Sequence, residues 1–449
     1  MRTPVSIVAA ALVLLAGPIP PAHAGDPVPV RLNQAKLLAS LGAAGDVLGR
    51  AVAVSGGIVV VGAQLDDDNG TDSGSAWIYG EPAGGWDGTL VEIARLVPSG
   101  AGMQDFFGRS VAVEGGVVVV GAWGSDDNGS LSGAVYVFVE PPGGWSGLVV
   151  EESAKLLASD GAAFDLFGGA VAISGGTIVV GADSDDNDNG SDSGAVYVFT
   201  EPPGGWAGVL EEDAKLLPTD GAEEDNFGLS VAVSGGTVVA GAPFHDDVGA
   251  AYVFREPAGG WAGTLNQSAK LVHSVPGMGD NFGESVAISG AHVVVGASND
   301  DGHGKAYVYT EPAGGWVGAV TQSARLESSD GTAGDRFGWS VAISGSRIVV
   351  GDWSRDETVA DTGAAYLFHR PGGGWSGVVL QTAKLLAADR AANDRFGFAV
   401  AVDGDTVVAG ALFDDDNGED SGSAYVFDFT IFTDGFESGD AGAWSATVP

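Results

Sequence analysis

Acidic side chains that could bind a metal ion are concentrated in one short stretch of the sequence. Residues 183–192 contain five aspartates and two asparagines, at Asp183, Asp185, Asp186, Asn187, Asp188, Asn189 and Asp192. Calcium prefers about six to eight oxygen ligands, and alternating Asp and Asn side chains before a glycine turn can supply them. We therefore interpret the side chains that match this pattern as candidate calcium ligands: Asp183, Asp185, Asn187, Asp188 and Asn189.

Two further acidic stretches are candidate calcium sites, one with Asp66 and Asp68 and one with Asp414 and Asp416. The pattern that starts at Asp185 is only the first half of an EF-hand loop, because Val196 stands where the closing glutamate would be. Two other interpretations stay open. Asn-Gly and Asp-Gly pairs form tight turns whose carboxylates are solvated, and an acidic surface also suits salty surroundings.

Three histidines form a second group of candidate ligands. His245 and His303 lie in two shortened acidic stretches, and His273 lies between them in the sequence. Imidazole nitrogens suit transition metals, so a fold that brings the three together would create a metal or ligand patch. The alternative is three unrelated surface histidines.

The elements that must position these residues repeat seven times. A signature Asp-x-(Phe/Leu)-Gly begins at Asp46, Asp105, Asp165, Asp225, Asp280, Asp335 and Asp394, at spacings of 55–60 residues. Each unit has an alternating strand, a continuous β-branched run, a third strand after the acidic loop, and a fourth strand with Ala-Lys-Leu or Ala-Arg-Leu. An aspartate before a glycine turn usually caps backbone N–H groups. We therefore assign the seven aspartates a structural role and no catalytic one.

Four short strands with glycine-rich turns cannot bury both faces of a sheet, whereas a ring of such sheets can. The sequence thus predicts an all-β fold, a seven-bladed β-propeller of four-stranded antiparallel blades, over residues 25–430. The first Ala-Lys-Leu precedes the first signature, and the last unit has none. The N-terminal segment around residues 34–40 should therefore supply the outer strand of the last blade.

Antiparallel pairing also predicts where the acidic loops lie. With the strands named A to D from the axis outward, the B–C loops and the D–A crossovers share one face of the ring. All the acidic stretches are B–C loops, so this face should be strongly negative and should hold the three histidines on adjacent blades. Six tryptophans follow Gly-Gly in the C–D hairpins, and we expect them to pack the hairpin onto its blade; they are Trp86, Trp145, Trp206, Trp261, Trp316 and Trp375.

The repeats resemble a known family. The stretch from Asp225 to Pro243, DNFGLSVAVSGGTVVAGAP, is similar to the FG-GAP repeat of integrin α-subunit propellers and of many bacterial exported proteins. The resemblance implies the propeller fold and a bias towards adhesion or ligand binding. It also implies calcium sites between strands A and B, but here those links are as short as Ser-Gly-Gly, so these sites cannot be transferred to this chain.

Composition limits the partners and the compartment. The formal net charge is −40, from 59 acidic and 19 basic residues, which disfavours nucleic acid and anionic membranes as partners. There are no cysteines, so a disulfide or a thiolate site is excluded. Residues 1–24 have the basic start, short apolar core and Ala-His-Ala end of a signal peptide, and the core is too short to span a bilayer. We expect residues 431–449 to form a C-terminal tail outside the ring, and part of this tail resembles the sorting tails of some bacterial exported proteins.

These observations predict a secreted or cell-surface propeller that acts as a monomeric binding or adhesion module. Its partner would be a protein or glycan at the acidic face, and Ca²⁺ its cofactor, with no catalysis and no membrane insertion. One alternative is an extracellular propeller enzyme, a hydrolase or lyase acting on a polymer, because propellers also host enzymes. Another is a structural component of the cell envelope.

Overall fold

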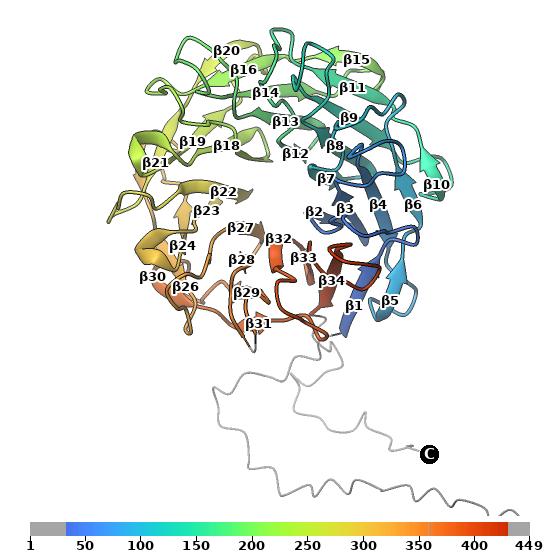
Figure 1. Ribbon diagram of the computed structural model, residues 1–449. Coiled ribbons are helices and arrows are strands. Elements are labelled where there is room, and N and C mark those ends of the chain that lie inside the picture. The colour runs from blue at the N-terminus through green and yellow to red at the C-terminus, as the bar shows by residue number, and fades with distance from the viewer. Residues whose placement is uncertain (1–32, 358, 430–449) are drawn as a thin grey trace, which may run out of the picture. The chain divides into compact units, whose positions relative to one another are not determined.

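The computed structural model describes residues 33–357 and 359–429, and residues 32–429 form one compact unit. The predicted signal peptide (residues 1–24) and the predicted tail (residues 431–449) lie outside the described residues. Within them the fold is all-β: seven sheets stand around a central axis, and two 3-10 turns, η1 (His245–Asp247) and η2 (Asp300–Gly302), are the only helical segments (Figure 1). The predicted seven-bladed propeller is confirmed.

Each blade begins at the axis with a short strand A that packs against the strands A of its neighbours. In the order of blades 1 to 7, these strands are β2 (Ala51–Ser55), β7 (Ser110–Glu114), β12 (Ala170–Ser174), β17 (Ser230–Ser234), β22 (Phe282–Ser289), β27 (Ser340–Ser344) and β32 (Phe396–Asp403). Strand B follows, as β3 (Ile58–Ala63), β8 (Val117–Ala122), β13 (Thr177–Ala182), β18 (Thr237–Ala242), β23 (His292–Ala297), β28 (Arg347–Asp352) and β33 (Thr406–Ala411).

Strands C and D complete the antiparallel part of each blade. Strands C are β4 (Ser75–Gly80), β9 (Ala134–Val139), β14 (Ala195–Thr200), β19 (Ala250–Arg255), β24 (Lys305–Thr310), β29 (Ala364–His369) and β34 (Ser423–Asp428). Strands D are β6 (Ala94–Leu96), β11 (Ala154–Leu157), β16 (Ala214–Leu217), β21 (Ala269–Val272), β26 (Ala324–Glu327), β31 (Ala383–Leu385) and, for blade 7, β1 (Asn33–Leu38).

The closure of the ring is as the sequence predicts. Strand β1 pairs antiparallel with β34, with Ala35 opposite Val426 and Leu37 opposite Ala424. The side chains of Ala35 and Leu37 are fully buried in the core between blades 7 and 1. The first described strand thus completes the last blade, and Figure 1 shows β1 beside β34.

A fifth strand in six of the blades was not predicted. The C–D connections of blades 1 to 6 each contain a short strand E that pairs in parallel with strand D of the preceding blade in the ring; for example, Gly208 lies opposite Ala154. These strands are β5 (Gly88–Val91), β10 (Gly147–Val150), β15 (Gly208–Glu211), β20 (Gly263–Asn266), β25 (Gly318–Thr321) and β30 (Gly377–Leu380). Among the described residues, six sheets therefore have five strands and blade 6 has four.

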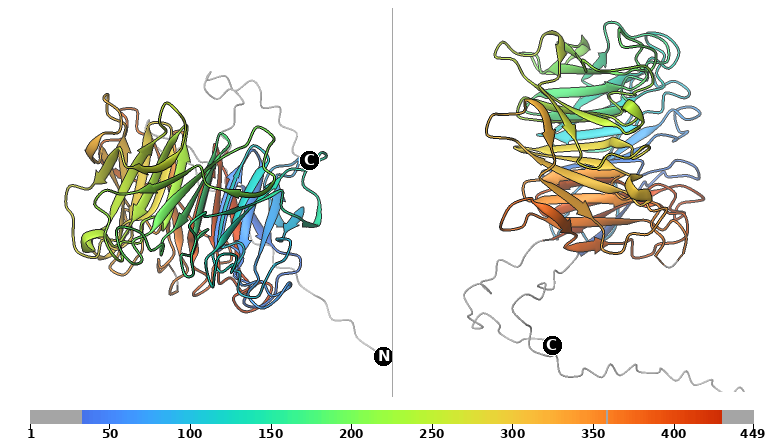
Figure 2. Two further views of the ribbon diagram at one scale, coloured as in Figure 1. Left: turned by 90° about the horizontal axis from the view of Figure 1, so that it is seen from above. Right: turned by 90° about the vertical axis from the view of Figure 1, so that its left-hand side faces the viewer.

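The core lies between neighbouring blades, where the two faces of adjacent sheets meet. The β-branched residues of strands B are almost completely buried on both faces, which explains their continuous apolar run. All six hairpin tryptophans are buried, and the most exposed of them, Trp261, is only 6% exposed. This agrees with the packing role predicted for them. Figure 2 shows the blades edge-on, with loops emerging on both sides of the ring.

Candidate functional site

The B–C loops and the crossovers lie on the same side of the ring, as predicted. Asn189 Nδ2 in a B–C loop donates to the carbonyl of Pro218 in the next crossover at 3.3 Å, and Asn128 Nδ2 makes the equivalent bond to Ala158 at 3.1 Å. On the opposite side, the C–D hairpins bond to the A–B turns, as from the Glu201 N–H to the Gly176 carbonyl at 2.7 Å. We call the side formed by the B–C loops and the crossovers the loop face.

The seven signature aspartates cap turns within the crossovers. Asp165 is buried, and its carboxylate accepts the N–H of Ala162, three residues earlier, at 2.7 Å. The same bond joins Asp46 to Ala43, Asp105 to Gly102, Asp225 to Ala222, Asp280 to Gly277, Asp335 to Thr332 and Asp394 to Ala391. Burial raises the pKa of Asp46 and of Asp165 to about 6. These contacts support the structural role that the sequence predicted for the seven aspartates.

A lysine of the chain itself reaches the base of the loop at residues 183–192. Lys215 on β16 places its Nζ 2.8 Å from Asp160 Oδ2 and 3.1 Å from Asp185 Oδ2. Tyr197 on β14 donates its hydroxyl to Asp185 at 2.6 Å. Burial alone lowers the pKa of Lys215, but its hydrogen bonds to Asp160 and Asp185 outweigh burial and raise that pKa. The ammonium group is therefore a fixed positive charge under the loop.

A Lys or Arg side chain also pairs with carboxylates of the loop face, in the B–C loop or in the crossover, in the other blades. Each comes from strand D, except Lys305, which lies on strand C. The pairs are Arg95 with Asp66 and Asp68, Lys155 with Asp127, Lys270 with Asp220, Lys305 with Asp300 and Asp301, Lys384 with Asp330 and Glu357, and Lys36 with Asp389, Asp414 and Asp416. The candidate calcium ligands Asp66, Asp68, Asp414 and Asp416 all take part in these pairs.

Other polar side chains of the residue 183–192 loop hold its own backbone. Asn187 Nδ2 donates to Asp185 Oδ1 and to the Gly194 carbonyl, and Asn187 Oδ1 accepts the N–H of Asn189 at 3.0 Å. Asp188 is exposed, and Asp183 follows β13, where burial raises the pKa of its side chain. Asp185 and Asn187 come together at the base of the loop, where their oxygens already accept hydrogen bonds from this chain. These contacts fit a self-neutralised loop better than a calcium cage, and calcium binding stays a prediction.

The three candidate histidines occupy three different settings. His245 Nδ1 lies 2.8 Å from Asp225 Oδ2 and its Nε2 lies 2.8 Å from Lys270 Nζ, within blade 4. His303 Nδ1 lies 3.2 Å from the carbonyl of Asp301. His273 is buried in the crossover from blade 4 to blade 5. Within the described residues, the one group of three or more potential metal ligands contains His273 with Asp280 and Asp300, and neither His245 nor His303 belongs to it.

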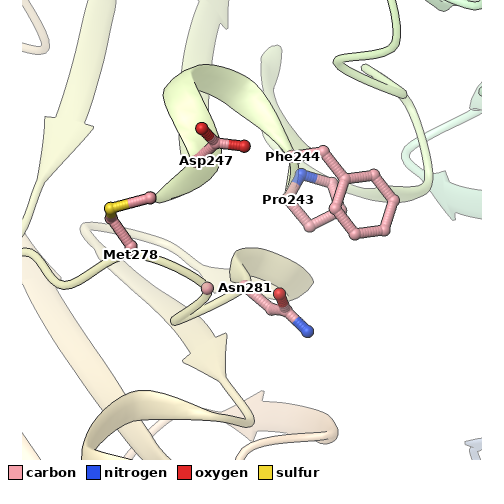
Figure 3. Close-up of a pocket in the computed structure, with 6 residues that line it drawn as sticks. Pro243, Phe244, Asp247, Met278 and Asn281 are labelled. Atoms are coloured by element: carbon pink, nitrogen blue, oxygen red, sulfur yellow. The ribbon is translucent and has the colours of Figure 1, made fainter.

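A pocket of about 360 Å³ opens on the loop face between blades 4 and 5. Its walls are the B–C loop of blade 4, with Pro243, Phe244 and Asp247, and the crossover into blade 5, with Met278, Gly279 and Asn281. Figure 3 shows Met278 beside Asp247, with Phe244 and Pro243 across the opening. The two walls are joined by a bond from the Gly279 N–H to the Asp247 carbonyl at 2.6 Å.

Two large apolar side chains that line the pocket are exposed to solvent: Phe244 is 51% exposed and Met278 83%. Val275, in the same crossover as Met278, is 70% exposed. The sequence analysis missed these residues. The two shortened B–C loops could have indicated this exposed apolar surface, because a short loop leaves the neighbouring crossover uncovered.

Aromatic rings also cluster at the loop-face ends of the two inner strands of blades 6 and 7. Trp339, Trp353 and Phe398 contact one another, with ring centroids 5.3–6.5 Å apart. The guanidinium of Arg50 lies 4.6 Å from the Phe398 ring and that of Arg395 lies 4.5 Å from the Trp353 ring. These rings pack against one another, whereas the pocket between blades 4 and 5 offers open volume, so that pocket is the better candidate for a ligand.

Blade 6 contains a buried acid that departs from the repeat. Asp352 replaces the alanine that ends strand B in the other blades, and it is fully buried. Its Oδ1 accepts the N–H of Arg336 at 2.8 Å, whereas its Oδ2 has no partner among the described residues. Burial, together with the charge of Asp335, raises the pKa of Asp352 to about 7.

Asp352→Asn is expected to make the protein more stable at pH 8 and to leave it almost unchanged at pH 4. The folded state holds a proton on Asp352 more tightly than the unfolded state does, so this residue's contribution to stability is lost as the pH rises from about 4 to about 7. At about 1.4 kcal/mol per pKa unit, the gain at pH 8 should be on the order of 2–4 kcal/mol. Urea unfolding at both pH values measures it. Asp356→Asn, an exposed change in the loop that follows β28, is the control, and an equal gain at both pH values would contradict the burial argument.

The repeats match the model of a known family. The model of the FG-GAP repeat matches residues 32–79, 90–138, 150–199, 210–254, 265–309, 320–368 and 379–427. No curated protein matches the chain. Among solved structures, the chain is similar to the WD40 β-propeller domain of Doa1, with 10% sequence identity and a TM-score of 0.46, over 84% of this chain and 92% of that chain. The repeat matches cover most of the sequence and coincide with the seven blades, and the chain therefore belongs to the FG-GAP repeat family.

Proposed function

We propose that this protein is an exported, non-catalytic binding propeller that holds a partner protein at the pocket between blades 4 and 5. The family and the fold support a binding or structural propeller in general. Export is supported by the signal-peptide pattern of residues 1–24. The part of the chain that the structure describes contains no helix with the length and hydropathy of a membrane span. The pocket and its exposed apolar border are the observation that carries the proposal.

The chemistry of the border indicates what the partner offers. Isolated exposed apolar residues are common, but Phe244 and Met278 line one pocket and Val275 lies in the same crossover. Aromatic and methionine side chains are enriched at the centres of protein interfaces. A pocket of this size accepts one large apolar side chain of a partner.

The charge of the surroundings adds a second requirement. Asp246 and Asp247 are both exposed beside the pocket, and the whole chain carries a net charge of −40. Complementary charge speeds encounter and excludes acidic partners. The expected ligand is therefore a peptide segment in which a large apolar residue is flanked by lysine or arginine.

A displayed library of random peptides, selected on the chain from residue 25 onward, tests this proposal. Selected peptides should combine a large apolar residue with basic ones. The double variant Phe244→Ser/Met278→Ser should weaken their binding, measured by titration calorimetry, by about ten-fold or more, because central interface residues typically contribute at least about 2 kcal/mol.

The chain offers a matched control. Met103 and Phe164 are 73% and 60% exposed in two other crossovers of the loop face. The double variant Met103→Ser/Phe164→Ser removes the same kinds of side chain and should bind the peptides with unchanged affinity. Equal losses in both variants would overturn the assignment to this pocket. Cleavage of an extracellular polymer by the wild-type chain would favour the enzyme alternative, and a selection without any binder would favour a structural role.

A further inference from the structure

Blade 5 contains a buried histidine whose ring nitrogens lack partners. The side chain of His273 is 3% exposed, and neither Nδ1 nor Nε2 has a hydrogen-bond partner within the described residues. Its ring stacks on Phe282 with a centroid distance of 4.9 Å. An unpaired buried polar group costs about 1–3 kcal/mol, so its presence in a native fold calls for an explanation such as a bound ion.

Two carboxylates face this histidine. Asp280 Oδ2 lies 3.8 Å from His273 Nε2, and Asp280, Asp300 and His273 each offer an atom within 4.8 Å of the others. All three residues are buried. One imidazole nitrogen and two carboxylates form a ligand set that zinc and related transition metals use, with a remaining position for water.

Blade 5 differs here from the other blades. In blades 3, 4, 6 and 7 the strand D lysine pairs with a crossover aspartate, such as Asp220 with Lys270. Val275 stands at that crossover position in blade 5, and the strand D residue Arg325 pairs with Glu327 instead. In blade 5 the positive charge next to the B–C loop comes from Lys305 on strand C, which contacts both Asp300 and the exposed Asp301. Lys305 can therefore release Asp300 and keep a carboxylate partner.

We propose that His273, Asp280 and Asp300 form a binding site for a divalent transition metal of the zinc type. The site stands on its own geometry and does not depend on the proposed partner pocket. It does lie next to that pocket, because Asp280 is the residue between Gly279 and Asn281 in the pocket wall. A bound metal would fix the crossover that carries Met278.

Titration calorimetry with Zn²⁺ on the chain from residue 25 onward tests the site. The wild type should bind one Zn²⁺ tightly, and His273→Gln should lower this affinity by at least roughly ten- to a hundred-fold, since even the loss of a supporting residue costs that much. His245→Gln and His303→Gln, the other two histidines of the loop face, are matched controls and should leave the affinity unchanged.

A second variant separates a metal site from a structural role of the histidine. Lys305→Met removes the ammonium group that competes for Asp300 and should strengthen Zn²⁺ binding, whereas a purely structural disturbance would weaken it. Cobalt added to the wild type should give the visible absorption of a Co²⁺ ion with nitrogen and oxygen ligands, and His273→Gln should abolish it. Zinc binding that is absent from the wild type, or equal in wild type and His273→Gln, would overturn the proposal.

Discussion

A chain that begins at residue 41 is expected to lose the closed ring. It lacks β1, which pairs with β34 on one side and in parallel with β5 on the other. Ala35 and Leu37 on this strand are fully buried, and removal of a buried leucine side chain by itself costs about 2–5 kcal/mol. Loss of the whole strand removes several buried side chains and the strand's pairing together. It should therefore lower the free energy of unfolding by more than about 5 kcal/mol, the upper end for a single core deletion. Urea unfolding followed by tryptophan fluorescence measures the loss relative to the chain from residue 25 onward.

Addition of the missing strand provides the control. A synthetic peptide of residues 30–42 should restore much of the lost stability, because an added strand can pair with the open sheet edge. The same peptide with Ala35→Asp and Leu37→Asp should not, because both side chains enter the core. An unchanged unfolding curve for the shortened chain would show that β1 is dispensable for closure.

Lys215→Met is expected to destabilise the protein by roughly 3–5 kcal/mol, the range found when one partner of a buried ion pair is removed. The variant leaves Asp185, whose side chain is 3% exposed, without its cation. The double variant Lys215→Met/Asp185→Asn should recover much of the loss, since it removes the uncompensated charge as well. Thermal unfolding of the three proteins at neutral pH is the measurement.

The same variant tests calcium binding at the acidic loops. In the wild type the ammonium of Lys215 already lies among the oxygens of Asp160 and Asp185, so Ca²⁺ and a chelator at matched ionic strength should give the same melting temperature. In Lys215→Met those carboxylates lack a cation, and millimolar Ca²⁺ should raise the melting temperature by mass action. A rise specific to Ca²⁺ in the wild type, lost in Asp185→Ala, would instead support the calcium site predicted from the sequence.

The parts of the fold predicted from the sequence are those that repeat. Seven copies of one signature established the blade count, and the additional Ala-Lys-Leu before the first copy predicted the closing strand. The parallel strand E was missed because its residues, as in Gly208–Glu211, are mostly exposed. An outer edge strand with little burial has no alternating pattern that periodicity can detect.

The candidate site was harder to predict, because side-chain partners depend on the register between strands. The lysine of each Ala-Lys-Leu lies opposite a tyrosine of strand C, as Lys215 does with Tyr197, and this places it under the B–C loop. A cation and an acidic loop that repeat together are a signal that the sequence analysis could have used. Antiparallel pairing predicts which face of the ring each histidine lies on, but residues on the same face need not touch. The contacts of the histidines could therefore not be predicted.

The pairing of the first strand with the last has a consequence for how the protein is made. The N-terminal segment is synthesised first, yet β1 can pair with β34 only after nearly 400 residues have followed. Contacts this distant in sequence form slowly, and until then β1 has an unpaired backbone edge that could join another chain. The charge of Lys36 on β1 should lower that risk, since a charged residue on an open edge opposes aggregation. The residue that neutralises an acidic loop in the finished ring would thus protect the nascent chain before the ring closes.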